Sequence, residues 1–277
     1  MMAKENAMAA DTAARSRRRR MHPLLPVALL AIALATAGVA GTAAWREQSE
    51  ARRVQLAQWR NVAIAAEDDA ALAALRAAAL AGETAAQAAL GEALWSRPGA
   101  QQHAEGQRWL WQAAERGDAG AHFVLGKAAF LGGPASAGAA PAAAPELPAA
   151  WRHLGIAAAA GHAGAAYYLG LLQRGGYGRT PDPAAAARSF TAAAEAGIPH
   201  AMFMLANAYR DGAGVARDEA RAVAWYEAAA ERDHPESILA LAMAYRHGEL
   251  GLERDERSYR MHLAESAHAL KHPALRP

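Results

Sequence analysis

Cysteine is absent from the sequence, and aromatic residues are scarce. Without cysteine the chain can form no disulfide, no thiolate metal site and no cysteine nucleophile. Aromatic residues make up only 6% of the 277 residues, although 53% of the residues are hydrophobic. Alanine and leucine therefore carry much of the apolar content, and such a composition favours closely packed helices.

Recognisable catalytic motifs are missing as well. Nucleophile elbows, zinc-protease motifs, phosphate loops and paired carboxylates do not appear. The chain has 11 histidines, and His268 and His272 could share one helix face, but no third ligand lies near them in the sequence. We therefore expect no enzymatic activity, no metal and no cofactor.

The positive charge of the chain is confined to its start. Residues 1–20 hold six basic and two acidic side chains, a net charge of +4, and residues 21–44 hold none of either sign. Because the whole chain is +2, residues 45–277 carry a net charge of −2. Generic nucleic-acid binding needs a basic face, so we expect no nucleic-acid partner.

An apolar run of 21 residues, Leu24 to Ala44, follows the basic block of Arg15 to Arg20. A helix of that length spans about 31 Å, enough to cross the hydrocarbon core of a bilayer. Trp45 and Arg46 stand where the membrane interface is expected, and arginine-rich flanks stay cytoplasmic. This pattern predicts a single-pass bacterial inner-membrane protein with residues 1–23 as a disordered cytoplasmic tail and its bulk in the periplasm.

A cleaved signal peptide is the alternative reading of this segment. The small residues 41–44 suit a signal peptidase, although the apolar run is long for a signal core. Either interpretation exports the rest of the chain. Residues 45–67 mix charged and apolar residues, which predicts a juxtamembrane helix or spacer.

From residue 68 to residue 270 the chain repeats itself with a period near 36. Turn glycines stand at 82, 117, 161 and 197, with Asp233 in the fifth place. A small residue follows each turn, and a leucine follows four positions later. The small residues are Ala86, Ala121, Ala165, Ala201 and Ser237, and the leucines are Leu90, Leu125, Leu169, Leu205 and Leu241. Small and large residues at this spacing lie on one helix face and allow neighbouring helices to approach closely.

Helix boundaries are marked by side chains that can cap them. Asp68 or Asp69 is expected to start a helix near 70–81, and Asp182, Asp218 and Asp255 precede later helices. His162 and His234 follow turn positions, where polar residues usually cap. One spacing is longer than the rest, and its Pro-, Gly- and Ala-rich residues 132–147 predict a flexible insertion. We expect residues 271–277 to form a tail.

The full pattern resembles the Sel-one-like repeat, a relative of the tetratricopeptide repeat. The motif is carried by Gly197, Ala201, Leu205, Tyr209, Gly212, Gly214, Val215, Asp218, Ala222, Trp225, Tyr226, Ala229 and Ala230. Residues 161–197 match well, whereas residues 82–130 and 235–268 match in part. The resemblance implies an all-α fold, a right-handed α/α superhelix of about five helix pairs following one transmembrane helix. It also implies a scaffold or adaptor that holds other proteins in a concave groove.

Two rows of equivalent residues are candidate binding surfaces. Arg174, Arg210 and Arg246 recur every 36 residues. They either form a basic stripe for an acidic peptide or anionic polymer, or they offset the helix dipole in the last turn of each helix, and we favour the second interpretation.

The second row contains Phe123, Tyr167, Phe203 and Leu239, with Lys127, Leu171, Asn207 and Met243 at the next variable position. It either lines a peptide groove or packs between repeats. From these features we expect a non-catalytic adaptor for another envelope protein or peptide. An adaptor for cell-wall glycan or its precursors is the alternative, and a hydrolase is the least favoured function.

Overall fold

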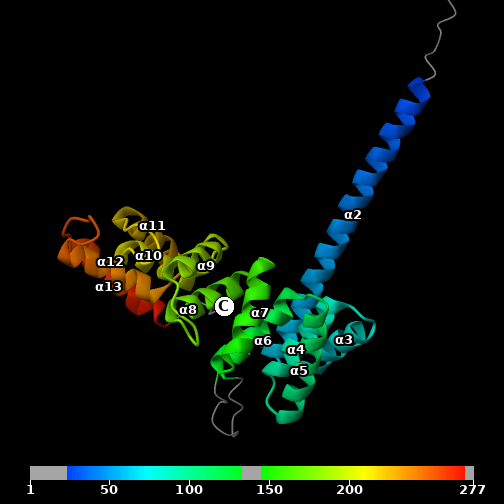
Figure 1. Cartoon of the computed structure of the whole chain (residues 1–277), viewed down its shortest axis with the longest axis horizontal. Coiled ribbons are helices and arrows are strands. Elements are labelled where there is room, and N and C mark those ends of the chain that lie inside the picture. The colour runs from blue at the N-terminus through cyan, green and yellow to red at the C-terminus, as the bar shows by residue number, and fades with distance from the viewer. Residues whose placement is uncertain (1–23, 133–144, 272–277) are drawn as a thin grey trace, which may run out of the picture. The chain divides into compact units, whose positions relative to one another are not determined.

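The computed structural model describes residues 24–132 and 145–271, with side chains from residue 45 onward, and is all-helical in this part (Figure 1). It divides into two compact units, residues 1–55 and 56–277. The helix bounds are α2 Leu24–Ala65, α3 Asp69–Leu80, α4 Thr84–Ser96, α5 Ala100–Glu115, α6 Ala119–Leu131, α7 Leu147–Ala159, α8 Ala163–Gly175, α9 Pro183–Glu195, α10 Pro199–Asp211, α11 Glu219–Ala230, α12 Pro235–His247 and α13 Glu256–Ala269.

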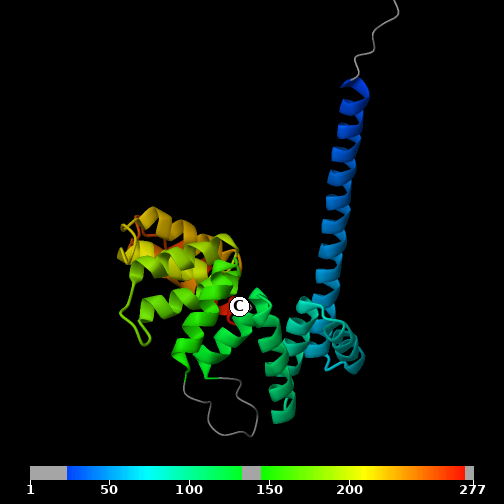
Figure 2. The ribbon, with the colours of Figure 1, turned by 45° about the vertical axis from the view of Figure 1, so that its right-hand side comes forward.

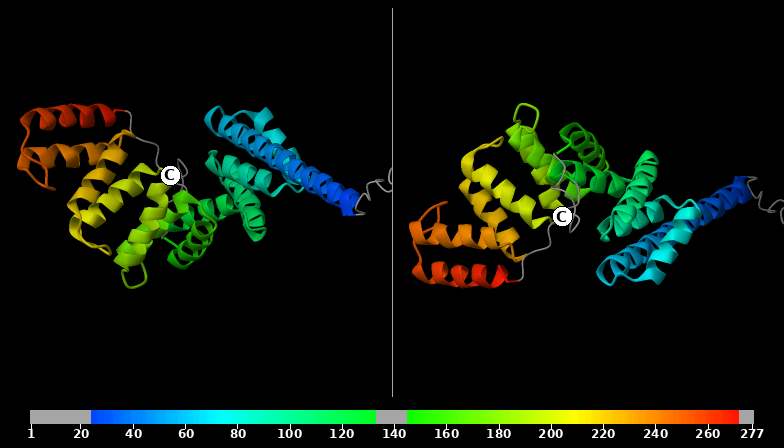
Figure 3. Two further views of the ribbon diagram at one scale, coloured as in Figure 1. Left: turned by 90° about the horizontal axis from the view of Figure 1, so that it is seen from above. Right: turned by 90° about the horizontal axis from the view of Figure 1, so that it is seen from below.

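Helices α4 to α13 form five antiparallel pairs, and each pair packs against the next. The pairs follow one another in chain order from cyan to red in Figures 2 and 3. The repeat pattern is therefore confirmed as an all-α solenoid with about five helix pairs. Its right-handed sense stays a prediction.

The start of the solenoid core lies earlier than residue 68. Leu56 and Ala63, in the last turns of α2, are 3% and 0% exposed and share a core with Leu75 and Leu90. The last third of α2 therefore covers the apolar face of α3 and α4. A single pair at the end of an array needs such a cover, because it cannot bury its own face.

Capping side chains begin several helices where the sequence predicts them. Asp68, Asp182, Asp218 and Asp255 each accept a hydrogen bond from a backbone N–H in the first turn of their helix, and Asp118, which was not predicted, does so in α6. His162 and His234 do the same through their rings. At the turns, Gly197 has φ +92° and Asp233 has φ +55°, the left-handed conformation that glycine adopts without strain.

Small residues set the distance between the two helices of a pair. Ala86, Ala121, Ala165, Ala201 and Ser237 are all fully buried. A Cβ on Gly170 would lie 2.6 Å from the ring of Phe190, so only glycine allows α8 and α9 to approach this closely. In the described residues no helix is both long and apolar enough to cross a membrane. The side chains of the expected span, 24–44, lie outside the described residues. Residues 133–144, which make up most of the expected insertion 132–147, also lie outside them.

Candidate binding surface

The three row arginines occupy equivalent places at the ends of α8, α10 and α12. Each lies in the last turn of its helix, and each is exposed. Their guanidinium groups reach side chains on a later helix. Arg174 Nη1 lies 3.4 Å from Met204 Sδ, Arg210 Nη1 donates to Tyr226 Oη at 3.2 Å, and Arg246 Nη1 donates to Tyr259 Oη at 3.2 Å.

Arg210 shows how firmly a row member is held. It forms an ion pair with Asp211 at 2.7 Å, and this hydrogen bond lowers the pKa of the Asp211 carboxyl and raises that of Arg210. The Tyr226 hydroxyl in turn donates to Asn207 Oδ1 at 2.7 Å, so Asn207 takes part in the same network. These contacts favour the helix-end role of the arginine row: Arg210 and Arg246 tie together the two helices of a pair, and Arg174 reaches the first helix of the next pair.

Aromatic residues of the second row contact the beginning of the next repeat. Phe123 stacks on His162 with ring centroids 4.3 Å apart, and Phe203 lies 5.1 Å from His234. Tyr167 similarly meets His200 at 6.0 Å. These three aromatic members of the row are half-buried, whereas the fourth member, Leu239, is exposed. This geometry favours packing between repeats over a peptide groove.

Lys127 also lies among rings of the protein itself. Its Nζ stands 5.5 Å from the centroid of Phe123 and 5.2 Å from that of Tyr168. Burial lowers the pKa of this ammonium group. The predicted site residues therefore do not converge on one pocket; they are distributed along successive repeat junctions.

A different residue type fills the arginine position in the first two helix pairs. Counting nine residues from the buried small residue gives Arg174, Arg210 and Arg246, but it gives Trp95 in α4 and Phe130 in α6. Neither α4 nor α6 has a basic residue in its last turn. At the end of α4 the C-cap residue Arg97 still supplies a cation, which pairs with Asp69, whereas the carbonyl end of α6 lacks the cation that the later pairs supply.

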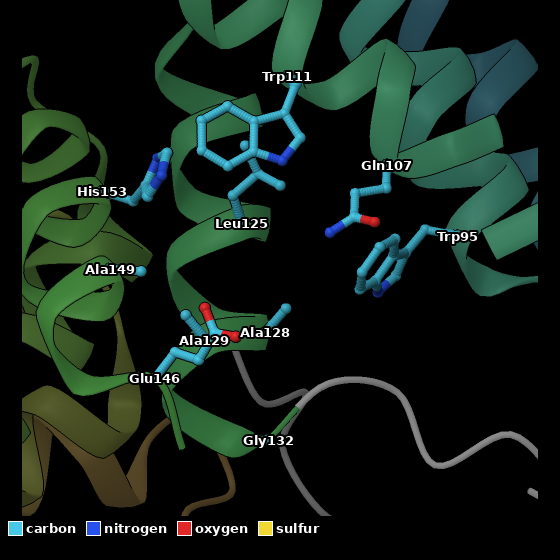
Figure 4. A pocket seen from close by; sticks show the side chains of 10 residues that line it. All are labelled: Trp95, Gln107, Trp111, Leu125, Ala128, Ala129, Gly132, Glu146, Ala149 and His153. Atoms are coloured by element: carbon cyan, nitrogen blue, oxygen red, sulfur yellow. The ribbon is translucent and has the colours of Figure 1, made fainter. Parts of the chain in front are cut away.

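A cavity of about 150 Å³ opens between these two helix ends. Trp95, Gln107 and Trp111 line it from α4 and α5, Leu125 lines it from α6, and Glu146 and His153 line it from the beginning and middle of α7. Figure 4 shows Trp95 and Gln107 on one side of the cavity, Trp111 and His153 beside each other above it, and the Glu146 carboxylate below them. The rings of Trp111 and His153 meet edge to face, with centroids 5.0 Å apart. The last turn of α6 forms the rest of the wall.

The backbone of Glu146 is hydrogen-bonded, whereas its carboxylate forms no capping hydrogen bond and no ion pair in the described part of the chain. It is the N-cap residue of α7, yet its side chain makes no capping hydrogen bond. Its backbone N–H donates to Ala129 O at 2.8 Å and so joins the start of α7 to the end of α6. Within residues 24–132 and 145–271, no cation pairs with this exposed carboxylate.

His153 presents a neutral wall to the cavity. Its Nδ1 lies 2.8 Å from Nδ1 of His122, and Arg152 donates to its Nε2 at 3.3 Å. Burial, with smaller effects of His122 and Arg152, lowers the pKa of His153 to about 4. With Nε2 accepting from Arg152, the proton of His153 is on Nδ1 and points to His122. At neutral pH, therefore, Glu146 is the sole charged residue that lines the cavity in the described part of the chain.

This cavity was missed by the row analysis of the sequence. Trp95 occupies the same position in its helix as the row arginines occupy in theirs. A comparison of this position across all five helix pairs would therefore have pointed to Trp95 from the sequence. Trp111 and Glu146 gave no such signal, because Trp111 lies on the second helix of a pair and Glu146 falls inside the predicted insertion 132–147, where the structure makes it the N-cap residue of α7.

Five stacked helix pairs with repeating caps, turns and interhelical contacts define the protein as an α-solenoid. The Sel1 repeat model matches residues 84–118, 163–198, 199–234 and 235–258. These four segments of the solenoid agree with the resemblance to Sel-one-like repeats seen in the sequence. The pair α6–α7 falls outside the matched segments, although it is a helix pair like the others.

Two solved structures share the fold. A protective antigen of uropathogenic Escherichia coli strains with an SLR fold is 30% identical over 72% of this chain, with a TM-score of 0.63. A Sel1 repeat protein from Oxalobacter formigenes is 25% identical, also over 72% of this chain, with a TM-score of 0.63. The match covers 41% of the E. coli chain and 78% of the O. formigenes chain. No curated protein matches the sequence.

Proposed function

We propose that the protein is a non-catalytic adaptor of the bacterial envelope that binds another protein or peptide through the concave surface of its solenoid. Sel1 repeat proteins are generally protein-interaction scaffolds, which supports this class of function. An array of stacked pairs also offers an extended surface that side chains from several repeats share.

Anchoring to the inner membrane is the second part of the proposal. It rests on the apolar run 24–44 behind the basic residues 15–20, which orient the chain with its start in the cytoplasm. An anchored adaptor searches for its partner within the envelope at a raised effective concentration.

The observation that carries the proposal is the cavity at the junction of the first two pairs. The arginine and aromatic rows are largely engaged in contacts within the solenoid, whereas Glu146 and the 40% exposed Trp111 are available to a partner. Binding through this junction places the partner on α5, α6 and α7.

Site-specific crosslinking tests the function in membranes. A photoreactive phenylalanine analogue replaces the exposed Gln107 at the cavity or, as the control, the exposed Arg188 on α9. We expect a defined protein adduct from position 107 and none from position 188. Absence of any protein adduct, together with sedimentation of the chain with purified cell wall, would overturn the protein-binding proposal in favour of the glycan alternative. Release of the chain by high salt would overturn the anchor.

A further inference from the structure

The two halves of the solenoid differ in the charges at the ends of their helices, and this difference indicates the charge of a ligand. In α8, α10 and α12 an arginine stands in the last turn, next to carbonyl groups that have no partner within the helix. In α4 and α6 Trp95 and Phe130 take that position, and the protein supplies no basic residue to the last turn. Arg97 is the C-cap residue of α4 and places a cation at that helix end, so it is the end of α6 that keeps its negative partial charge.

The cavity adds full negative charge and π surfaces to these helix ends. Glu146 contributes a carboxylate without a cation partner in the described part of the chain. Trp95 and Trp111 contribute indoles, the side chains over whose faces cations bind best. The Gln107 amide also reaches this space, and Figure 4 shows its nitrogen, rather than its oxygen, directed toward the middle of the cavity.

The nearest basic side chains do not occupy this space. Lys127 Nζ lies over the rings of Phe123 and Tyr168, and Arg152 donates to Nε2 of His153. Neither residue lines the cavity. Neutral His153 leaves the attraction of Glu146 for a cation intact.

We propose that the cavity lined by Trp95, Trp111 and Glu146 binds a cationic side chain, lysine or arginine, of the protein partner. The ligand's charge takes the place that the row arginines fill in the later pairs. This inference rests on the adaptor function proposed above, and it names the chemistry of the partner segment: a basic residue presented on an exposed loop or terminus.

The test uses the full chain labelled with 5-fluorotryptophan in a non-ionic detergent, which avoids headgroups that carry ammonium. The probes are the N-acetyl methylamides of arginine, lysine and citrulline, the last being a neutral analogue of arginine. Fluorine NMR follows the seven tryptophans of the chain, and Trp95→Phe and Trp111→Phe assign the two relevant signals.

We expect the arginine and lysine probes to shift the signals of Trp95 and Trp111 saturably, and citrulline to bind at least about tenfold more weakly. Glu146→Gln should weaken arginine binding about fivefold, since it removes one partly exposed ion pair. Glu83→Gln is the matched control, because Glu83 is also an N-cap residue whose side chain makes no capping bond. It should leave binding unchanged.

Equal binding of citrulline and arginine, or unchanged binding in Glu146→Gln, would overturn the inference, as would the absence of any shift. The crosslinking experiment separates this outcome from failure of the adaptor function. A partner captured equally by the wild type and by Glu146→Gln would preserve the adaptor and refute the cationic ligand. Circular dichroism on each variant establishes that it is folded.

Discussion

The first two helix pairs and the last three solve the same packing problem with different side chains. In α4 to α7 the second helix buries Leu110 or Leu154 against a glycine, whereas α9 and α11 bury the larger Phe190 and Tyr226. The later pairs also carry the row arginines. The lesson is that the regular half uses its large and charged residues to stabilise its own repeats, and the irregular half leaves a carboxylate and two indoles around an open cavity.

The largest expected effect tests the aromatic half of this comparison. Phe190→Ala should lower the free energy of unfolding by about 4 kcal/mol, because it leaves a cavity beside Gly170. Phe190→Leu, which copies the first two pairs, should cost about 1.5 kcal/mol or less. Urea unfolding followed by circular dichroism measures both variants. Equal losses would show that leucine fills this position no better than alanine, and would contradict the view that the two halves solve one packing problem with interchangeable side chains.

A smaller effect tests the close approach of α4 and α5. A Cβ on Gly106 would stand 2.7 Å from Gly91 O and 2.8 Å from Trp95 N, both backbone atoms that cannot yield easily. Gly106→Ala should therefore destabilise the chain by about 1–3 kcal/mol, although alanine favours helices. The equivalent position in α11 is the fully buried Ala222. Ala222→Gly is the control and should cost about 1 kcal/mol. A stabilised Gly106→Ala variant would contradict the tight crossing.

The two halves should lose stability together in mild acid. Burial lowers the pKa of both His153 and His234 to about 4, and these residues are 3% and 2% exposed. A histidine in the unfolded chain has a pKa of about 6.5. Below that pH the unfolded chain therefore binds protons that the folded chain does not. Stability that is complete above pH 6.5 is lost progressively as the pH falls toward 4.

Urea midpoints at pH 7 and pH 5 measure this loss. His153→Gln or His234→Gln should each reduce the difference between the two pH values by on the order of 1–2 kcal/mol. His247→Gln, at an exposed position, is the control. An unchanged pH difference in both variants would show that these histidines are not held neutral by the fold.

The smallest effect tests the arginine row. Arg246→Gln removes a last-turn cation and the guanidinium that lies 5.1 Å from the centroid of Tyr259. We expect a cost of about 0.5–1 kcal/mol, and less at high salt. Thermal unfolding measures the change, and Arg188→Gln, on the exposed side of α9, is the control that should have little effect. A loss of partner binding in Arg246→Gln without any loss of stability would instead support the basic stripe for an acidic peptide.

Much of the fold could be predicted from the sequence, because its signals are local. Asp68 and Asp218 cap helices through backbone groups three residues away, and Gly197 ends one unit and begins the next. Ala201 and Leu205 repeat with the period of the stacked pairs. Such features depend on neighbours within one repeat, so one sequence is enough to place them.

The candidate site could be predicted only in part, because it depends on which helices meet. Equivalent spacing correctly placed Arg210 and Phe203 at matching positions in their repeats, but it could not tell whether they face a partner or the next helix. Only packing puts Phe203 beside His234, and only packing brings Trp95 and Glu146 to one cavity across the long insertion.

The sequence by itself thus determined the helical pairs, their caps, their turns and the period at which they stack. The tertiary structure decided which repeated side chains are engaged within the solenoid and where an uncommitted carboxylate meets two indoles. The physical reason is range: hydrogen bonds that start and stop a helix act over a few residues, whereas burial and the surroundings of a charge are set by residues far apart in the chain.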